Sequence, residues 1–156
     1  MNELSPFLAE QYAAELTAFR ASLESVPLEE FGVSRLGHAP AWHALHISEW
    51  LRLAMLGDRT PNYHHLGWED QPWVGPLGTE PAPLGAEAGK AAVLARLDEV
   101  SGQVLAFLKG MTADDLKDMA FSPSAPGGER PRLQALGLHL RHIGYHRGQL
   151  QLAMKG

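Results

Sequence analysis

Hydrophobic residues recur every three or four positions in four long segments of the chain, and this pattern constrains the fold more than any other feature of the sequence. The pattern predicts helices over residues 6–25, 40–56, 86–109 and 131–156. Strand-like alternation of useful length is absent from the sequence, and so is an internal repeat. Because amphipathic helices of this length bury their apolar faces against one another, we predict an all-α protein with a four-helix bundle as its single domain, residues 1–156.

Local signals fix where some of these helices begin. Ser5 is expected to cap the first helix, with Pro6 at its first position. Pro40 is expected to open the second helix in the same way. Between the third and fourth helices, residues 112–115 (Thr-Ala-Asp-Asp) are expected to cap a short helical turn.

The connection between the second and third helices, residues 57–85, is long and contains five prolines and five glycines. Structureless loops of this length are uncommon unless they cross the domain or serve a site. Its aromatic residues Tyr63, Trp68 and Trp73 indicate a packed segment, and Trp68 and Trp73 are candidates for the walls of a pocket. A long crossover connection after helix two also allows the second and third helices to run parallel.

The composition excludes several classes of function. The chain has no cysteine, which excludes disulfide scaffolds, thiolate zinc sites, iron–sulfur clusters and cysteine nucleophiles. Its 18 acidic and 13 basic residues give a net charge of -5, without the clustered basic stripe that nucleic-acid binding requires. No apolar run approaches the roughly 18 residues of a membrane span. We therefore expect neither nucleic acid nor membrane as a partner, and the acidic N-terminus without a signal segment favours a cytoplasmic location.

Six of the eight histidines lie in two short stretches: His38, His43 and His46 in one, and His139, His142 and His146 in the other. In the last helix the histidines are spaced by three and four residues, and the same line continues to Gln149 beside the apolar face. In the second helix, His43 and His46 share a line with Trp50. Both helices are therefore expected to turn imidazoles toward the core.

Such an arrangement suits a metal ion. Imidazoles in a bundle interior stay neutral because a buried charge is costly to desolvate, and neutral imidazole is the commonest metal ligand. Histidines four residues apart lie one turn apart on the same helix face, so His142 and His146 can hold one ion between them. A third ligand must come from another helix, and His46 is the best candidate. His43, one turn earlier, is either a substitute ligand or a substrate contact.

A metal site is one of two interpretations of these histidines. Helical histidines are also common as hydrogen-bonded core residues, and a chain with eight histidines produces the H-x-x-x-H spacing readily by chance. For His38, His64 and His65 we expect ordinary core or surface roles. For His139 the spacing leaves open two roles, supporting a ligand or lining the pocket.

Three further side chains lie near these lines. Glu49 is expected to orient an imidazole, to serve as a fourth ligand or to move protons, and the alternative is a solvated position on the helix. Gln149 is expected to hydrogen-bond a ligand imidazole or a bound water. Arg147 is expected at the surface, or paired with a carboxylate or an anionic substrate. Neither a Glu-x-x-His pair nor H-E-x-x-H occurs, which excludes the ferritin-like and zinc-peptidase sites.

The sequence H-I-S-E-W at residues 46–50 and the closing H-I-G-Y-H-R-G-Q-L at residues 142–150 resemble the DinB-like (DinB/YfiT-like) superfamily. The resemblance implies a four-helix bundle with parallel middle helices and one divalent ion bound by three histidines. Transferred by position, these are His46, His142 and His146, the same three that the helical spacing favours. The resemblance implies zinc or nickel as the ion, and homodimers are common among similar proteins. Iron and manganese are further alternatives for the ion.

The number of ligands bears on function. Closed structural zinc sites have four protein ligands, so three histidines with open coordination positions indicate catalysis. The ion can activate water for hydrolysis, or it can bind the thiolate of a low-molecular-weight thiol. The resemblance implies both activities, namely hydrolases and S-transferases or isomerases that use bacillithiol, mycothiol or glutathione. We expect thiol transfer to small electrophiles, with hydrolysis and non-catalytic, stress-related metal binding as alternatives, and the sequence assigns no catalytic residue.

Overall fold

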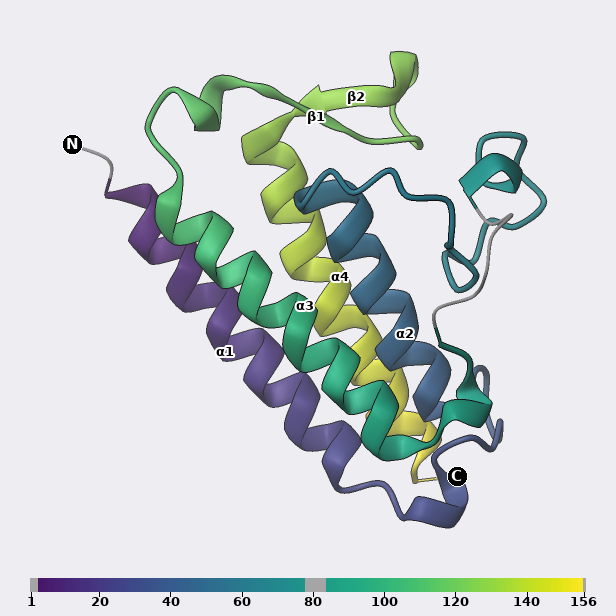
Figure 1. Ribbon diagram of the computed structural model, residues 1–156. Helices are drawn as coiled ribbons and strands as arrows, with labels where there is room; N and C mark the ends of the chain where they lie inside the picture. The colour runs from purple at the N-terminus through teal and green to yellow at the C-terminus, as the bar shows by residue number, and fades with distance from the viewer. Residues whose placement is uncertain (1–2, 78–83, 156) are drawn as a thin grey trace.

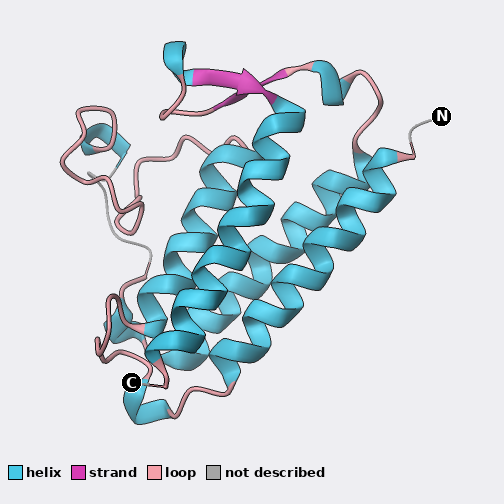
Figure 2. Cartoon of the chain, turned by 180° about the vertical axis from the view of Figure 1, so that it is seen from behind, coloured by secondary structure: helices cyan, strands magenta, loops and turns pink. Residues whose placement is uncertain are grey.

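The computed structural model describes residues 3–77 and 84–155 and shows four long helices with one short hairpin (Figures 1 and 2). The helices are α1 (Leu4–Glu24), α2 (Pro40–Trp50), α3 (Lys90–Gly110) and α4 (Arg132–Ala153). A π-helical turn, η2 (Leu51–Met55), directly extends α2. The hairpin pairs β1 (Met119–Phe121) with β2 (Glu129–Pro131) in antiparallel register. The predicted all-α class and four-helix bundle are confirmed, and the short hairpin is an addition to it.

The helices form a bundle in which α1 packs against α3 and α4, and α2 packs against the same two helices. Figure 1 shows that α2 and α3 run in the same direction, whereas α1 and α4 run in the opposite one. The expectation of parallel middle helices is therefore confirmed. The long connection after α2 permits this topology, because it returns the chain to the end of the bundle where α2 began. Residues 78–83, which include the predicted loop prolines Pro81 and Pro83, lie outside the described residues.

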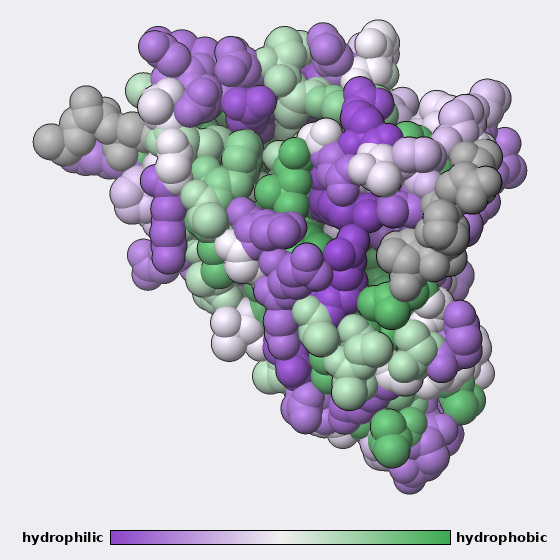
Figure 3. Space-filling model, in the orientation of Figure 1, coloured by the Kyte–Doolittle hydropathy of each residue, from purple (hydrophilic) through white to green (hydrophobic). Residues whose placement is uncertain are grey.

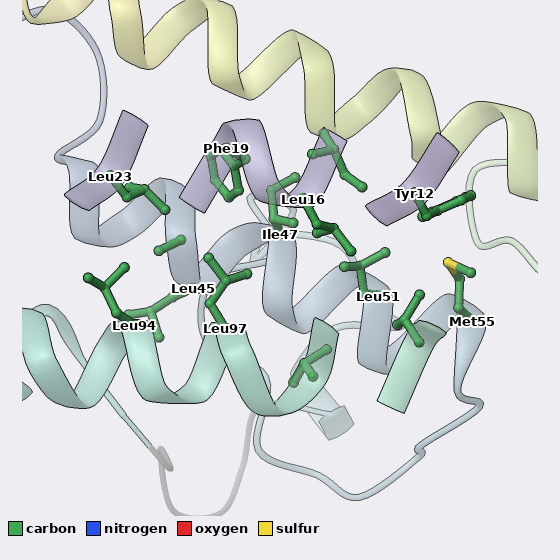
Figure 4. Close-up of a cluster of buried hydrophobic side chains, with 14 of the residues drawn as sticks. Tyr12, Leu16, Phe19, Leu23, Leu45, Ile47, Leu51, Met55, Leu94 and Leu97 are labelled. Atoms are coloured by element: carbon green, nitrogen blue, oxygen red, sulfur yellow. The ribbon is translucent and has the colours of Figure 1, made fainter. Parts of the chain in front are cut away.

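Residues of α1, α2 and α3 form most of the main core, and Leu136, Ile143 and Leu150 of α4 also belong to it. Figure 4 shows side chains of the three helices pointing toward one another, among them Phe19 of α1, Ile47 of α2 and Leu97 of α3, each at most 1% exposed. Full burial of a side chain of this size contributes roughly 1.5–3 kcal/mol. The apolar faces predicted from the helical spacing therefore account for the bundle, and they fix the orientation of α2.

The predicted capping role of Ser5 is wrong, because α1 begins at Leu4 and Ser5 lies inside the helix. Ser5 is 3% exposed, and its Oγ donates to the carbonyl oxygen of Leu108 at 2.6 Å, with the carbonyl of Met111 at 3.2 Å. The last carbonyls of a helix have no partner within that helix. Ser5 therefore satisfies the C-terminal end of α3 instead of the N-terminal end of its own helix.

The third helix also begins later than predicted. Residues 86–88 form a separate 3-10 turn, and α3 starts at Lys90. Gly89 between them has a φ of +92°, a conformation that favours glycine and breaks the helix. The predicted turn after Thr112 is present: Thr112 N–H donates to Asp115 Oδ2 at 2.7 Å, and Asp115 N–H donates to Thr112 Oγ1 at 3.1 Å.

The hairpin between α3 and α4 was not predicted. Each strand has three residues, which is too short for an alternating pattern to stand out. The turn contains Gly127 and Gly128 with φ values of +77° and +76°. Figures 1 and 2 place the hairpin at the end of the bundle where α4 begins, and β1 also contacts η2.

The first part of the long connection is packed, as its aromatic residues predicted. Tyr63, Leu66 and Val74 are each at most 2% exposed and form a second small core with Leu53 of η2. The backbone N–H of Tyr63 donates to the carbonyl of Leu77 at 2.9 Å, which closes the segment on itself. The segment is therefore held rigidly beside α2, where it can contribute backbone atoms to a site.

The surface carries polar and apolar residues side by side, as the hydrophilic and hydrophobic colours of Figure 3 show for one face. Within the described residues, none of the helices combines the length and the hydropathy that crossing a bilayer requires.

Candidate metal centre

His46 of α2 and His142 and His146 of α4 bring their ring nitrogens together where the two helices pack. One nitrogen from each ring lies within 4.8 Å of the others, and the three could hold a metal ion. His46 is 5% exposed, His146 is 6% exposed, and His142 is partly buried. The Nε2 atoms of His46 and His142 are 3.1 Å apart. Two nitrogens bound to one tetrahedral zinc are about 3.3 Å apart, so this pair fits a shared ion.

The hydrogen bonding of His46 fixes which of its nitrogens is free to bind. Its Nδ1 lies 2.6 Å from the backbone carbonyl oxygen of His65. A carbonyl oxygen only accepts, so Nδ1 carries the proton and Nε2 of the neutral ring carries the lone pair. Metal-binding histidines commonly have such a carbonyl partner, which sets the tautomer and the ring orientation. The lone pair of His46 Nε2 therefore points at the centre of the cluster.

Glu49 acts on His46 through the loop that supplies this carbonyl. Its carboxylate accepts hydrogen bonds from the backbone N–H groups of His64 at 3.0 Å and His65 at 2.5 Å, and it lies 3.1 Å from Nδ1 of His65. Glu49 is 6% exposed, so the solvated position that the sequence left open is not observed. It contacts the loop rather than an imidazole of the cluster. His65, for which no role at the site was expected, contributes its backbone carbonyl.

His43 contacts the cluster through His146. The Nδ1 atoms of the two rings are 3.0 Å apart, and His43 is 2% exposed. One of these nitrogens must donate and the other must accept. If His146 binds an ion through Nε2, its Nδ1 carries the proton and donates to His43. His43 then holds the tautomer of His146 as His65 holds that of His46.

Trp42 is a site residue that the sequence interpretation missed. Its ring stacks on that of His46 with centroids 4.3 Å apart, and on that of His38 with centroids 3.5 Å apart. The spacing of four residues between Trp42 and His46 was a usable signal, because it places the two side chains on one helix face. His38, expected to be incidental, thereby also lies at the edge of the site.

His139 and Gln149 both line the cavity beside the cluster. His139 is 6% exposed, and within the described residues its Nε2 has no hydrogen-bond partner. Gln149 is exposed, and its Nε2 donates to the hydroxyl of Tyr145 at 2.9 Å rather than to an imidazole. Arg147 turns away from the cavity and pairs with Glu15 of α1 at 3.2 Å, which ties α4 to α1.

Burial lowers the pKa of the three cluster histidines and of His43 and His139. The pKa falls to about 2 for His46 and about 3 for His146, through desolvation first and then through repulsion by neighbouring imidazoles. The pKa of His142 falls to about 4 through desolvation, and burial likewise lowers the pKa of His43 and His139 to about 4. At neutral pH these imidazoles are therefore uncharged, which is the form that binds metal.

The cluster opens into a cavity of about 600 Å³. All three histidines line it, together with the aromatic side chains of Trp42, Trp50, Trp68, Phe121 and Tyr145. The expected wall residue Trp68 is present, whereas Trp73 packs behind the wall, with its ring 6.2 Å from that of Trp50. No carboxylate lies among the described residues that line the cavity. An ion held by three imidazoles here would face a largely aromatic space.

Comparison with known families matches residues 11–150 to the profile of the DinB superfamily. Neither a curated protein nor a solved structure gives a significant match to the chain. The matched region covers most of the chain and contains all three histidines of the cluster. The chain belongs to the DinB superfamily.

Proposed function

We propose that this protein binds one divalent transition metal through His46, His142 and His146 and uses it to transfer a low-molecular-weight thiol to small electrophiles. The observation that carries the proposal is the convergence of the three neutral imidazoles at the wall of an aromatic cavity. Imidazole ligands suit zinc and nickel, which we propose as the ion, with iron or manganese as the alternatives.

A divalent ion with open coordination positions would supply a positive charge that lowers the pKa of a bound thiol and favours its thiolate. The protein's own residues fix the geometry around it. His65 and His43 hold the ring orientations of His46 and His146. The rings of Trp42 and Trp50 pack against His46 and His142. In the transfer, the thiol sulfur forms a bond to the electrophilic carbon, and the thiol proton leaves with the displaced group.

The lining of the cavity supports thiol transfer over hydrolysis. Hydrolysis is commonly assisted by a carboxylate that takes a proton from water. The described residues that line this cavity include no Asp or Glu. A thiol has a pKa near 8.5 and needs only a modest shift to ionise at neutral pH. Because the chain has no cysteine, the thiol must come from a second substrate.

The test is to measure turnover in parallel assays with zinc-loaded and nickel-loaded protein. One assay follows consumption of bacillithiol, mycothiol or glutathione with a model aryl chloride, and the other follows ester and amide hydrolysis. We expect metal-dependent thiol consumption with at least one thiol, and its loss in His142→Ala. Metal-dependent hydrolysis without thiol transfer would establish the hydrolase instead. Metal binding with turnover in neither assay would mean that the ion only ties α2 to α4.

A further inference from the structure

The arginines of this protein divide into two groups by their partners. Nine are present, and six of them pair with a carboxylate: Arg20, Arg35, Arg52, Arg96, Arg132 and Arg147. In the described part of the chain, Arg59, Arg130 and Arg141 have no carboxylate partner. Arg141 lines the cavity, Arg130 bonds to Ser122 and Ser124 of its wall, and Arg59 lies over the ring of Phe121, which also lines it. Unpaired positive charge is thus concentrated at one end of the candidate site.

Arg130 of β2 is bound to two serines of the cavity wall. Its Nε donates to Ser122 Oγ at 2.6 Å, and its second terminal nitrogen lies 3.2 Å from Ser124 Oγ. Both serines line the cavity, and Ser122 is 4% exposed. Because the guanidinium donates to each hydroxyl oxygen, each serine keeps its own proton to donate elsewhere. The hairpin therefore presents two hydroxyl donors backed by a positive charge.

Arg141 supplies a second charge at the same end. It lines the cavity one residue before His142. Its Nη1 lies 3.6 Å from the position that a Cβ would occupy at Gly137, so the side chain extends along α4 toward the start of that helix. The start of α4 is where the hairpin packs. Arg59 adds a third charge behind the wall, with its guanidinium 3.7 Å from the ring centre of Phe121.

Among the described residues that line the cavity, none carries a negative charge that would balance these arginines. The imidazoles are neutral, and the lining holds no carboxylate. A planar guanidinium binds carboxylates through paired hydrogen bonds, and such charge-assisted bonds are stronger than neutral ones. A negative group on a bound molecule is therefore the natural partner for this end of the cavity.

We infer that Arg141, with the Arg130-backed hydroxyls of Ser122 and Ser124, forms a subsite for a carboxylate on one of the two reactants. The inference rests on the proposed function in one respect, that the cavity is where the reactants meet. The carboxylate belongs either to the thiol or to the electrophile. In both cases the subsite orients the molecule along α4, with its reactive end at the histidine cluster and its charged end at the hairpin.

The first experiment measures binding without requiring turnover. Zinc-loaded protein is titrated with benzoate and with benzamide, followed by NMR chemical shifts. We expect benzoate to bind more tightly, and Arg141→Gln to weaken benzoate binding about tenfold without affecting benzamide. Arg141→Lys should retain part of the preference. Arg20→Gln, which removes the same charge from an ion pair between α1 and α3, is the matched control and should bind benzoate normally.

Unchanged benzoate affinity in both Arg141→Gln and Ser122→Ala would overturn the subsite. That result would place the carboxylate on the metal or on no defined site, because neither of those depends on the hairpin or on Arg141. Arg141 is exposed, so its substitution does not disturb the core.

The second experiment identifies which reactant carries the carboxylate. Turnover is compared for 3-mercaptopropionate against its amide, and for 4-chloro-3-nitrobenzoate against its amide. Arg141→Gln should raise KM for the carboxylate form of one reactant about tenfold and leave kcat nearly unchanged. Equal KM for acid and amide in both pairs would overturn the inference. Absence of turnover with every pair would count against the proposed function, and the benzoate titration would still decide the subsite.

Discussion

The candidate centre depends, at the scale of single residues, on which ring nitrogen of each histidine carries the proton. The carbonyl of His65 forces that proton onto Nδ1 of His46, whereas His43 supports the corresponding tautomer of His146 when its own Nδ1 accepts the hydrogen bond. The His65 contact therefore leaves a lone pair on the nitrogen of His46 that faces the cluster. A histidine whose tautomer is already fixed gives up less freedom when it binds an ion.

Glu49→Gln tests whether the His65 carbonyl fixes the tautomer of His46, because Glu49 holds the loop that carries this carbonyl. The carboxylate of Glu49 accepts from two backbone N–H groups, and an amide can replace only one of its oxygens as an acceptor. The loop carrying the His65 carbonyl should loosen, and metal affinity should fall roughly tenfold. This is the lower end of the range of losses seen when a residue that supports a metal ligand is substituted. The affinity is measured by competition with a chelator.

Glu69→Gln is the matched control for that substitution. Glu69 accepts from a backbone N–H of the same loop at 2.8 Å, but its side chain is exposed and does not support His65. Its metal affinity should equal that of the unaltered protein. Equal affinities for all three proteins would show that Glu49 only stabilises the loop.

The sequence predicted His46, His142 and His146 as one cluster because helical spacing determines which face each side chain takes. It could not predict the part played by His65, since that residue acts through its backbone and a carbonyl carries no sequence signature. Glu49 had several open roles because its partner lies in a loop whose path does not follow from periodicity. The hydrogen bond of Gln149 to Tyr145 was missed although the two are one turn apart on α4.

At the scale of elements, the antiparallel packing of α4 against α2 brings five imidazoles together at one interface, four of them buried and His142 partly buried. This interface differs from the apolar contact of α1 with α3, because its stability depends on the charge state of its side chains. The π-helical turn η2 then carries the chain out of α2 and into the packed loop, where Leu56 N–H bonds back to Leu51 at 3.1 Å.

We predict that the metal-free protein loses stability as the pH falls from about 6.5 toward 4. The pKa values of His43, His139 and His142 are lowered to about 4, so the folded state takes up few protons until the pH nears 4, while the unfolded state takes them up from about pH 6.5. Above pH 6.5 neither state is protonated and the effect vanishes. Each such histidine costs on the order of 1 kcal/mol per pH unit within the window.

Thermal unfolding at pH 7.5, 6 and 5 measures this loss. His64→Ala removes an exposed imidazole from the loop and should leave the pH dependence unchanged. Bound metal should protect the protein until the pH is low enough for protons to displace it. A melting temperature that stays constant between pH 7.5 and pH 5 in the metal-free protein would contradict the burial of neutral imidazoles.

The four long helices were predicted because each of them has enough turns for its apolar face to repeat. The hairpin was not, because each of its strands has only three residues, too few for an alternating pattern to show in the sequence. The start of α1 was misplaced for a different reason. Ser5 satisfies carbonyls at the end of α3, more than one hundred residues away in sequence.

At the scale of the whole molecule, the apolar core and the histidine cluster occupy different parts of the bundle. The apolar core, to which all four helices contribute, holds the bundle together, whereas the histidine cluster lies between α2 and α4 under the loop and the hairpin. The gathering of Arg130 and Arg141 at one end of the cavity exists only in the folded chain. Because an ion at the cluster joins two helices, it should also stabilise the fold, by about 2.7 kcal/mol at a free concentration of 100 Kd.

The assignment of the three metal ligands is tested most directly by measuring the metal content of the purified, metal-loaded protein and of four variants. The helix content of each variant is checked by circular dichroism. The unaltered protein and His64→Ala should each hold one ion per chain. His46→Ala, His142→Ala and His146→Ala should each lose it while remaining folded. Retention of one ion per chain by all three cluster variants would contradict the assignment of His46, His142 and His146 as the metal ligands.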